Sequence, residues 1–423
     1  MKIRHLIDRP LHLSLVLVFA LVAISASSSA NPVVELDTTQ AGSIPASDLL
    51  PADIMQADSY QIAPSAAVYS GIVVFSMDTK FGQATLVGRQ GVMDRVLELR
   101  AITQLEAMKS SEVYKSSLKS SAGKPVQGVK NLADSPKETL VAMGRGIGGF
   151  FADVGYSMVS DDPNQESVAK TAVGFAAAKR QLAFNLGVSP YSTFQPLQDE
   201  LSDVAWAAVG GGMTVSVFFK AFEGAGTALS VTGTAESMRG LVRDNSPREL
   251  QNMNFDRLLA MGVEEPLAEV MLDNFNYDPE NETRLIGALH SMQGVAGREL
   301  FIRRAALQDR PYNARLMREW AELFADYHAN VQKVKAIAIS QTAPQLVLEG
   351  DKVIALVPID YLTNAPGFQQ RNAANIASLR AMGLTPDEAW VTGKIDPAVR
   401  QMLLDSGWNR LVEDAGSLLV AKK

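Results

Sequence analysis

The chain has 423 residues and a formal net charge of −7, and it contains no cysteine. Disulfides and cysteine-based metal centres are therefore excluded, and the acidic balance argues against nucleic acid or anionic lipid as a bulk electrostatic partner. Histidine is also scarce, because two of the four histidines, His5 and His12, lie in the first 30 residues. We therefore expect no metal site and no other cofactor.

The first 30 residues have the pattern of a signal peptide. Three basic residues precede an apolar run from Leu11 to Ile24, and Ser28-Ser29-Ala30 supplies the small residues of a signal-peptidase site. The apolar run is shorter than the roughly 20 residues that span a bilayer. We expect cleavage after Ala30 and a periplasmic or secreted protein that begins at Asn31.

The next two segments are a polar arm and a small β-rich unit. Residues 31–66 are rich in Ala, Ser, Asp and Pro without a sustained period, which predicts a flexible arm. In residues 67–135, the β-branched run from Ala67 to Met77 and the extended run from Gln83 to Gly88 flank turn residues, so we predict a β-hairpin. A helix with an apolar stripe is predicted from about Gln90.

Residues 136–340 are predicted to form a helical domain. A polar residue stands before a proline at several positions, and proline is favoured at the first position of a helix. A stripe at spacings of three and four, from Leu316 to Val334, predicts one long helix with a core-facing side. The helix starts predicted in this way, here and further along the chain, are Pro136, Pro163, Pro247, Pro279, Pro386 and Pro397.

The helical period ends near Pro344, and residues 344–423 predict a separate C-terminal α/β lobe. Gly350-Asp351 is a two-residue hairpin signal between two apolar runs. Helices at about 368–382 and 397–406 alternate with short strands near 389–392, 410–412 and 418–421. The expected fold class is α+β: a mainly helical central bundle with a short N-terminal β-hairpin and a small C-terminal α/β lobe.

A glycine-rich segment at 144–149 satisfies the G-x-G-x-x-G pattern, but a helix start rather than a buried strand precedes it, so a dinucleotide site is not expected. A helix with this many interior glycines would not persist alone in water, so it needs a surface to pack against. We expect packing within the chain, with membrane contact as the alternative. The residues of this face are Ile147, Phe150, Phe151 and Val154.

No complete catalytic motif is present, and we assign no catalytic residue. The acidic clusters at 199–203 and 319–326 have helical spacings typical of solvated helix faces. Asp360 is a better candidate for a ligand or partner surface, because it follows a strongly apolar strand, and residues at strand ends often line a crevice. Thr392 and Lys394 precede a helix start in the same lobe and could present backbone amides to an anion.

The run from Leu182 to Leu201, LAFNLGVSPYSTFQPLQDEL, resembles a box found in exported proteobacterial proteins of unassigned function, which usually read LGVDPY. Segments at 81–109 and 391–408 are similar to other parts of the same proteins. The resemblance implies export and carries no activity. From the residues alone, Gly187 and Ser189-Pro190 predict a rigid corner between two helices.

Three functions are consistent with the sequence. The first is an exported, non-catalytic cell-envelope protein that acts as a binding or scaffold module, with a protein or envelope component as its partner. The second is a hydrolase with an unrecognised carboxylate- or hydroxyl-based site. The third is a protein that associates with a membrane surface through its glycine-rich helices, which the acidic charge does not favour.

Overall fold

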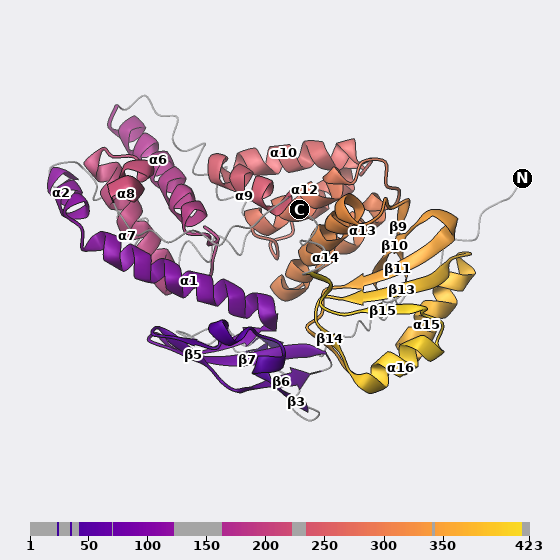
Figure 1. The fold of residues 1–423 in the computed structure, drawn as a ribbon. Coiled ribbons are helices and arrows are strands. Elements are labelled where there is room, and N and C mark those ends of the chain that lie inside the picture. The colour runs from indigo at the N-terminus through magenta and orange to yellow at the C-terminus, as the bar shows by residue number, and fades with distance from the viewer. Residues whose placement is uncertain are drawn as a thin grey trace, which may run out of the picture.

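The computed structural model describes residues 23–24, 34–35, 42–69, 71–121, 163–221, 234–340 and 343–416 (Figure 1). They combine helices with several β-sheets, so the chain is a mixed α and β protein. Of the expected signal peptide, the described part is β1 (Ala23–Ile24), which pairs with β2 (Val34–Glu35). The glycine-rich segment lies outside the described residues, and its expected face stays a prediction: Ile147, Phe150, Phe151 and Val154.

An antiparallel sheet occupies much of residues 42–87. The predicted hairpin is confirmed in β7 and β8, but it belongs to a six-stranded sheet in the described chain. The prediction of a flexible arm is wrong from Gly42 onward, since Tyr60 and Ile62 bury their side chains in this sheet. Strands this short leave almost no periodic signal. The elements are β3 (Gly42–Pro45), η2 (Ala46–Asp48), η3 (Ala52–Ile54), β4 (Gln56–Ala57), β5 (Tyr60–Ile62), β6 (Ser65–Tyr69), β7 (Ile72–Thr79) and β8 (Gly82–Val87).

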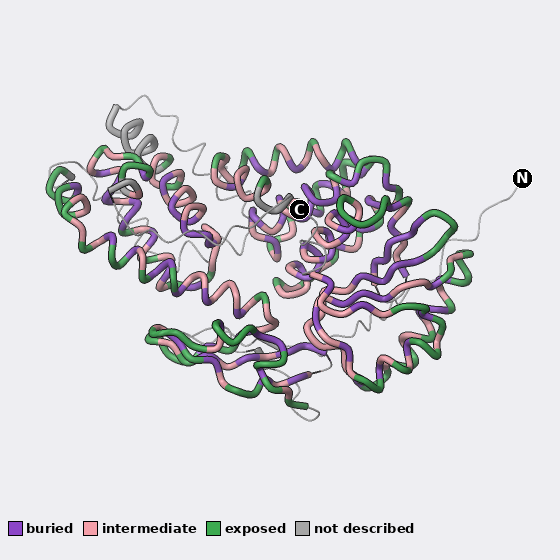
Figure 2. The backbone as a smooth tube through the Cα atoms, viewed as in Figure 1, coloured by how far each residue is buried: buried purple, intermediate pink, exposed green. Residues whose placement is uncertain are grey.

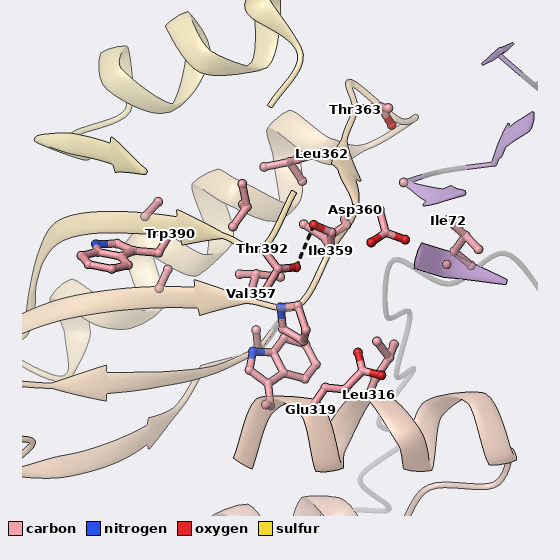
Figure 3. A pocket seen from close by; sticks show the side chains of 18 of the residues that line it. Ile72, Leu316, Glu319, Val357, Ile359, Asp360, Leu362, Thr363, Trp390 and Thr392 are labelled. Carbon is pink, nitrogen blue, oxygen red and sulfur yellow. Dashed lines mark hydrogen bonds between the residues drawn. The ribbon is translucent and has the colours of Figure 1, made fainter. Parts of the chain in front are cut away.

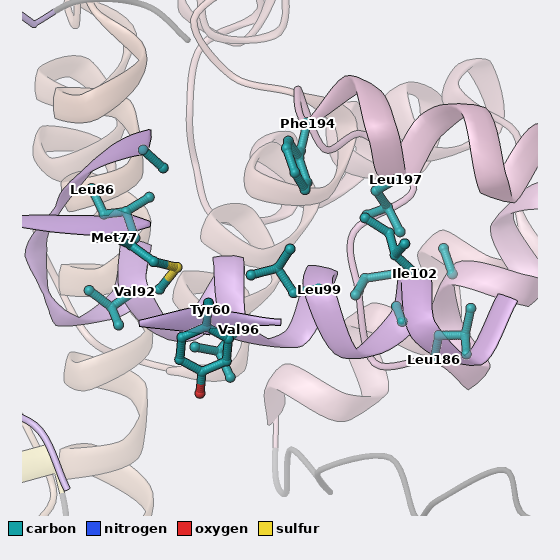
Figure 4. Close-up of a cluster of buried hydrophobic side chains, with 14 of the residues drawn as sticks. Tyr60, Met77, Leu86, Val92, Val96, Leu99, Ile102, Leu186, Phe194 and Leu197 are labelled. Atoms are coloured by element: carbon teal, nitrogen blue, oxygen red, sulfur yellow. The ribbon is translucent and has the colours of Figure 1, made fainter. Parts of the chain in front are cut away.

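The predicted helix after this sheet is α1 (Gly88–Lys109). Its apolar stripe is fully buried: Val92, Val96 and Ile102 are 0% exposed. Figure 4 shows this stripe facing Met77 and Leu86 of the sheet at one end and Leu197 at the other. α1 therefore joins the sheet to a group of helices in one core. These helices are α2 (Glu112–Ser121), α6 (Pro163–Asn185), α7 (Gln195–Gly211) and α8 (Val215–Ala221).

The second half of the helical region begins with caps that the sequence predicted. Ser246 and Glu249 form a reciprocal capping box, and the Asp278 carboxylate accepts a hydrogen bond from the backbone N–H of Asn281. Helix starts at Pro163, Pro247, Pro279 and Pro397 are confirmed; Pro136 lies outside the described residues. The helices are α9 (Thr234–Asp244), α10 (Pro247–Ala260), α11 (Glu265–Leu272), α12 (Pro279–Ser291), α13 (Arg298–Ala306) and α14 (Pro311–Asn330).

A five-stranded sheet follows, in the order β15-β13-β11-β10-β9. β11, β13 and β15 are parallel to one another, whereas β10 is antiparallel to both of its neighbours. The elements are β9 (Ala336–Ile339), β10 (Pro344–Val347), η4 (Glu349–Asp351), β11 (Lys352–Val357), β12 (Tyr361–Leu362), α15 (Phe368–Ala381), β13 (Thr385–Val391), β14 (Lys394–Ile395), α16 (Pro397–Asp405) and β15 (Arg410–Val412).

The predicted helix start at Pro386 is wrong, because Thr385 and Pro386 begin strand β13. Val353 pairs with Pro386 and Ile354 with Glu388, so Asp387 is an extra residue in the ladder. Proline is tolerated in a sheet at the start of a strand or beside such a bulge. The local signal for a helix cap was therefore overridden by strand pairing.

Helices cover both faces of the C-terminal sheet. Ile354 and Leu356 point into the cluster that contains α10 to α14, whereas Val353 and Ala355 point into the cluster formed with α15 and α16. Figure 2 shows the strands of this sheet as one of the most completely buried parts of the chain. The sheet begins at Ala336 and shares a core with the preceding helices, whereas the sequence predicted a separate lobe from residue 344.

Candidate functional site

The three residues predicted as a ligand or partner surface lie at one edge of the C-terminal sheet. Asp360 follows β11, and Thr392 and Lys394 follow β13, so the carboxyl ends of two adjacent parallel strands bring them together. The prediction of amides presented to an anion is wrong. The Thr392 N–H donates to the Val357 carbonyl, and the Lys394 N–H donates to the Asp360 carbonyl at 2.9 Å. The Lys394 ammonium pairs with Asp414.

Asp360 is held by the first turn of α1, which comes from the other end of the described chain. The Arg89 N–H donates to Asp360 Oδ2 at 2.8 Å, and Arg89 Nε lies 3.3 Å from Asp360 Oδ1. The Arg89 guanidinium also donates to the Thr392 carbonyl at 2.8 Å. Asp360 therefore caps α1 and neutralises Arg89. Burial raises the pKa of the Asp360 carboxyl, and its hydrogen bond and charge interaction with Arg89 partly offset this rise.

Two glycines permit this close approach. A Cβ on Gly393 would lie 1.9 Å from the Asp360 carbonyl oxygen, a distance that backbone atoms cannot accommodate. Gly88 has φ +75°, and its Cβ would lie 3.1 Å from the Asp360 carboxylate. The junction between α1 and the C-terminal sheet thus depends on glycine at both positions.

A cavity of about 220 Å³ lies beside this junction, at the carboxyl end of the C-terminal sheet; its outer part is lined by α14 and the start of α1, and its inner part by α15 and α16. Figure 3 shows Leu316 and Glu319 extending from α14 toward the loop that carries Ile359 and Asp360, while Thr392 donates a hydrogen bond to the Ile359 carbonyl at 3.1 Å. The lining is mainly apolar. Its large side chains include Trp320, Val357, Phe368, Trp390, Leu403 and Trp408.

The inner part of the cavity exists because small side chains stand side by side on the sheet. Ala355 and Ala389 are partners across β11 and β13, and both face α15 and α16. Larger side chains at these positions would fill the space beneath the helices. On the next strand, Leu346 pairs with Ile354, so the antiparallel register brings Gln345 beside Ala355. All three residues line the cavity.

Gln345 places a polar group in this inner part. Its side chain is 1% exposed, and its Nε2 donates to Asn375 Oδ1 at 2.7 Å and to Ser340 Oγ at 3.3 Å. Its Oε1 accepts no hydrogen bond from any residue that the structure describes. A buried polar atom without a partner is costly and is uncommon in folded proteins.

The outer part of the cavity is more polar. Glu319 lies 3.7 Å from Arg315 Nε and accepts a hydrogen bond from Arg318 at 3.1 Å. Burial raises the pKa of Glu319, and the charges of Arg318 and Arg315 act against that rise. Arg315 also donates to the Val87 carbonyl at 2.9 Å, which joins α14 to the N-terminal sheet. The prediction of a solvated face at 319–326 is wrong for Glu319 and Glu322, which pair with arginines in a largely buried setting.

The lining of the cavity is suited to contacts with an apolar molecule of matching shape. The two carboxylates of the cavity, Glu319 and Asp360, are both paired with arginines, and among the described lining residues none is Ser, His or Lys. No three His, Asp or Glu side chains gather as a metal site anywhere in the described chain. In that same part of the chain, no helix has the length and apolar character needed to cross a membrane.

The sequence identified the edge of the site through Asp360 but missed its interior. Gln345 lies in one of the two apolar runs that flank Gly350-Asp351, and Glu319 lies in an acidic cluster with the spacing of a solvated helix face. The sequence carries only a weak signal for the cavity. Ala355 and Ala389 are small residues next to larger apolar ones, and only the strand register shows that they are neighbours. Comparison of the chain with models of protein families, with curated proteins and with solved structures finds no match.

Proposed function

We propose that this chain is an exported, non-catalytic binding module that holds a small, largely apolar molecule in the cavity at the carboxyl end of the C-terminal sheet. The observation that carries the proposal is the cavity itself: mainly apolar walls with a few polar groups, which is the usual composition of a small-molecule site. An apolar cavity of about 150 Å³ holds a benzene molecule, so one or two rings fit this volume.

The charge pattern supports binding over catalysis. General acid–base chemistry needs a carboxyl group that can exchange a proton with a bound molecule. Here Arg89 occupies both oxygens of Asp360, and two arginines neutralise Glu319. Export is supported by the pattern of residues 1–30 and by the resemblance of the LGVSPY box to exported proteins. An envelope component of matching size is the partner class we propose.

The test is a titration of the full-length mature protein with 2-methoxynaphthalene, followed by its fluorescence. We expect saturable binding that Ala389→Leu weakens at least about tenfold, because the added side chain occupies the inner cavity. Ala377→Leu is the matched control, since Ala377 is exposed on α15 and does not line the cavity. Absence of saturable binding by the folded wild-type protein would contradict the proposal.

One observation favours a hydrolase as the second candidate. Glu319 is a largely buried carboxyl that lines an apolar cavity, an environment in which carboxylates act as nucleophiles. A naphthyl epoxide distinguishes the two candidates. A reactive carboxylate at 319 would open the epoxide and form an ester, which adds the mass of the reagent and is absent in Glu319→Gln. The binding module predicts no esterification at Glu319.

A further inference from the structure

We infer that the molecule held in the cavity carries a carboxylate group, which pairs with the guanidinium of Arg371. This inference rests on the proposed binding function and narrows its ligand class to compact apolar acids, such as aromatic carboxylates. Arg371 lies near the N-terminal end of α15 and lines the cavity.

Arg371 is a charge of the cavity lining that the described chain does not balance. The charged lining residues are Arg315, Glu319, Asp360 and Arg371. Glu319 lies beside Arg315, and Asp360 lies beside Arg89, so these charges are paired. Arg371 forms no ion pair with any Asp or Glu that the structure describes, and the first turn of α15 contains no acidic residue. Burial lowers the pKa of Arg371, and no carboxylate acts against this effect.

The guanidinium of Arg371 has donors to spare. Its Nη1 donates to the Pro366 carbonyl at 2.8 Å, in a bond that is exposed to solvent. Its Nε is enclosed and has no partner, whereas Nη2 remains accessible and also makes no hydrogen bond within the described part of the chain. A carboxylate supplies both an acceptor for Nη2 and the missing negative charge, and hydrogen bonds between ionised groups are stronger than neutral ones.

One face of α15 joins this charge to the apolar walls of the cavity. Phe368, Arg371, Asn372 and Asn375 all line the cavity, and their spacing of three, four and seven positions places them on one side of the helix. A Cβ on Gly367 would lie 2.9 Å from Arg371 Nη1, so the guanidinium lies over the end of α15 that carries Phe368. The other inner walls are apolar: Ala355, Ala389, Leu403 and Trp408. A flat apolar acid can therefore place its rings among these walls and its carboxylate at Arg371.

The experiment compares 2-naphthoate with 2-naphthamide, which have nearly the same shape but of which only the first is charged at neutral pH. For the mature wild-type protein, we expect 2-naphthoate to bind about tenfold more tightly, the discrimination typical of one hydrogen bond between charged groups. Arg371→Met keeps an apolar stem and should reduce this ratio to near one, whereas Arg371→Lys should retain part of it. Arg380→Met is the matched control, because Arg380 is exposed on the same helix and does not line the cavity.

The outcomes separate this inference from the function on which it rests. If the wild-type protein binds both probes equally, binding stands and the carboxylate is wrong. If Arg371→Met keeps the wild-type preference, or if Arg380→Met loses it as well, the assignment to Arg371 is wrong. Failure of both probes to bind the folded wild-type protein would overturn the proposed function itself. If Arg371→Met does not fold, Arg371→Gln provides the same comparison.

Discussion

The carboxylate of Asp360 accepts a hydrogen bond from the backbone N–H of Arg89 at 2.8 Å, across 271 positions of the chain. This contact caps α1 with a side chain from the C-terminal sheet, because Val87, the residue before α1, makes no side-chain cap. The N-terminal and C-terminal parts are thereby joined at the mouth of the cavity. The integrity of the site and the stability of the whole chain are therefore linked at Asp360.

Replacing Asp360 with Ala should destabilise the protein by about 1–3 kcal/mol, because the Arg89 N–H and guanidinium lose their partner in a partly buried position. Chemical denaturation measures this change. Asp360→Asn keeps a hydrogen-bond acceptor and should recover part of the loss. Asp58→Ala, at an exposed carboxylate, is the matched control and should have little effect. Equal stability of Asp360→Ala and Asp58→Ala would contradict the capping role.

The buried carboxyl of Glu282 predicts that stability falls as pH rises. Burial is the largest effect on this group and raises its pKa from 4.5 to about 8. Between pH 4.5 and about pH 8, the folded state therefore keeps a proton on Glu282 that the unfolded state has released. Stability should decrease through that window by at most about 1.4 kcal/mol per pH unit. The unfolding free energy of Glu282→Gln, measured from pH 5 to pH 8, should decrease less steeply than that of the wild-type protein. An unchanged slope would show that other groups cause the pH dependence.

Glu322 should be among the most sensitive charged positions. It accepts hydrogen bonds from Arg284 at 2.7 Å and from Arg318 at 2.7 Å, and its side chain is largely buried. Glu322→Ala leaves Arg284 with Glu280 and Arg318 with Glu319 as their remaining carboxylates, and it removes the shared partner of two largely buried guanidinium groups, so it should cost about 3 kcal/mol of unfolding free energy. The exposed pair of Lys80 and Glu106 provides the comparison, where Glu106→Ala should cost about 1 kcal/mol or less. Similar losses at both sites would be inconsistent with this difference in burial.

The shared core between the helices and the C-terminal sheet predicts the behaviour of a truncated chain. Trp320 donates to the Leu356 carbonyl at 2.7 Å, and Phe324 lies in the same buried cluster as Leu356. A chain that ends before β9 would expose this face of α14 and should aggregate or fail to accumulate. A soluble, cooperatively unfolding fragment would instead support the separate lobe that the sequence predicted. Size-exclusion chromatography and thermal unfolding of the fragment distinguish these results.

A signal peptide at residues 1–30 would be absent from the exported protein. Mass spectrometry of protein recovered from the envelope or the culture medium should identify Asn31 as the first residue. Recovery of the intact 45.5 kDa chain from those fractions would contradict cleavage after Ala30.

Local signals predicted much of the helical part of the fold. The stripe of α1 and the caps at Ser246 and Asp278 depend on residues close together in the sequence, so they could be identified without the structure. Pro386 shows the limit of such signals, because pairing of β13 with β11 overrode a local pattern typical of a helix start.

The site could be predicted only at its edge. Asp360 was identifiable because it follows an apolar strand, but its partner Arg89 is distant in sequence. The cavity depends on the register that aligns Gln345, Ala355 and Ala389, and alanine in a strand gives no signal of a cavity. Glu319 has the spacing of a surface residue, and its burial results from the packing of α14 against the sheet.

A crystal of the mature protein soaked with 2-bromonaphthalene would show whether this cavity binds a small apolar molecule. Bromine scatters anomalously, so its position is located independently of the refined ligand. We predict an anomalous peak within the cavity, between α15 and the alanine pair Ala355 and Ala389. Peaks confined to other surfaces, with none in the cavity, would mean that the cavity does not bind such a molecule.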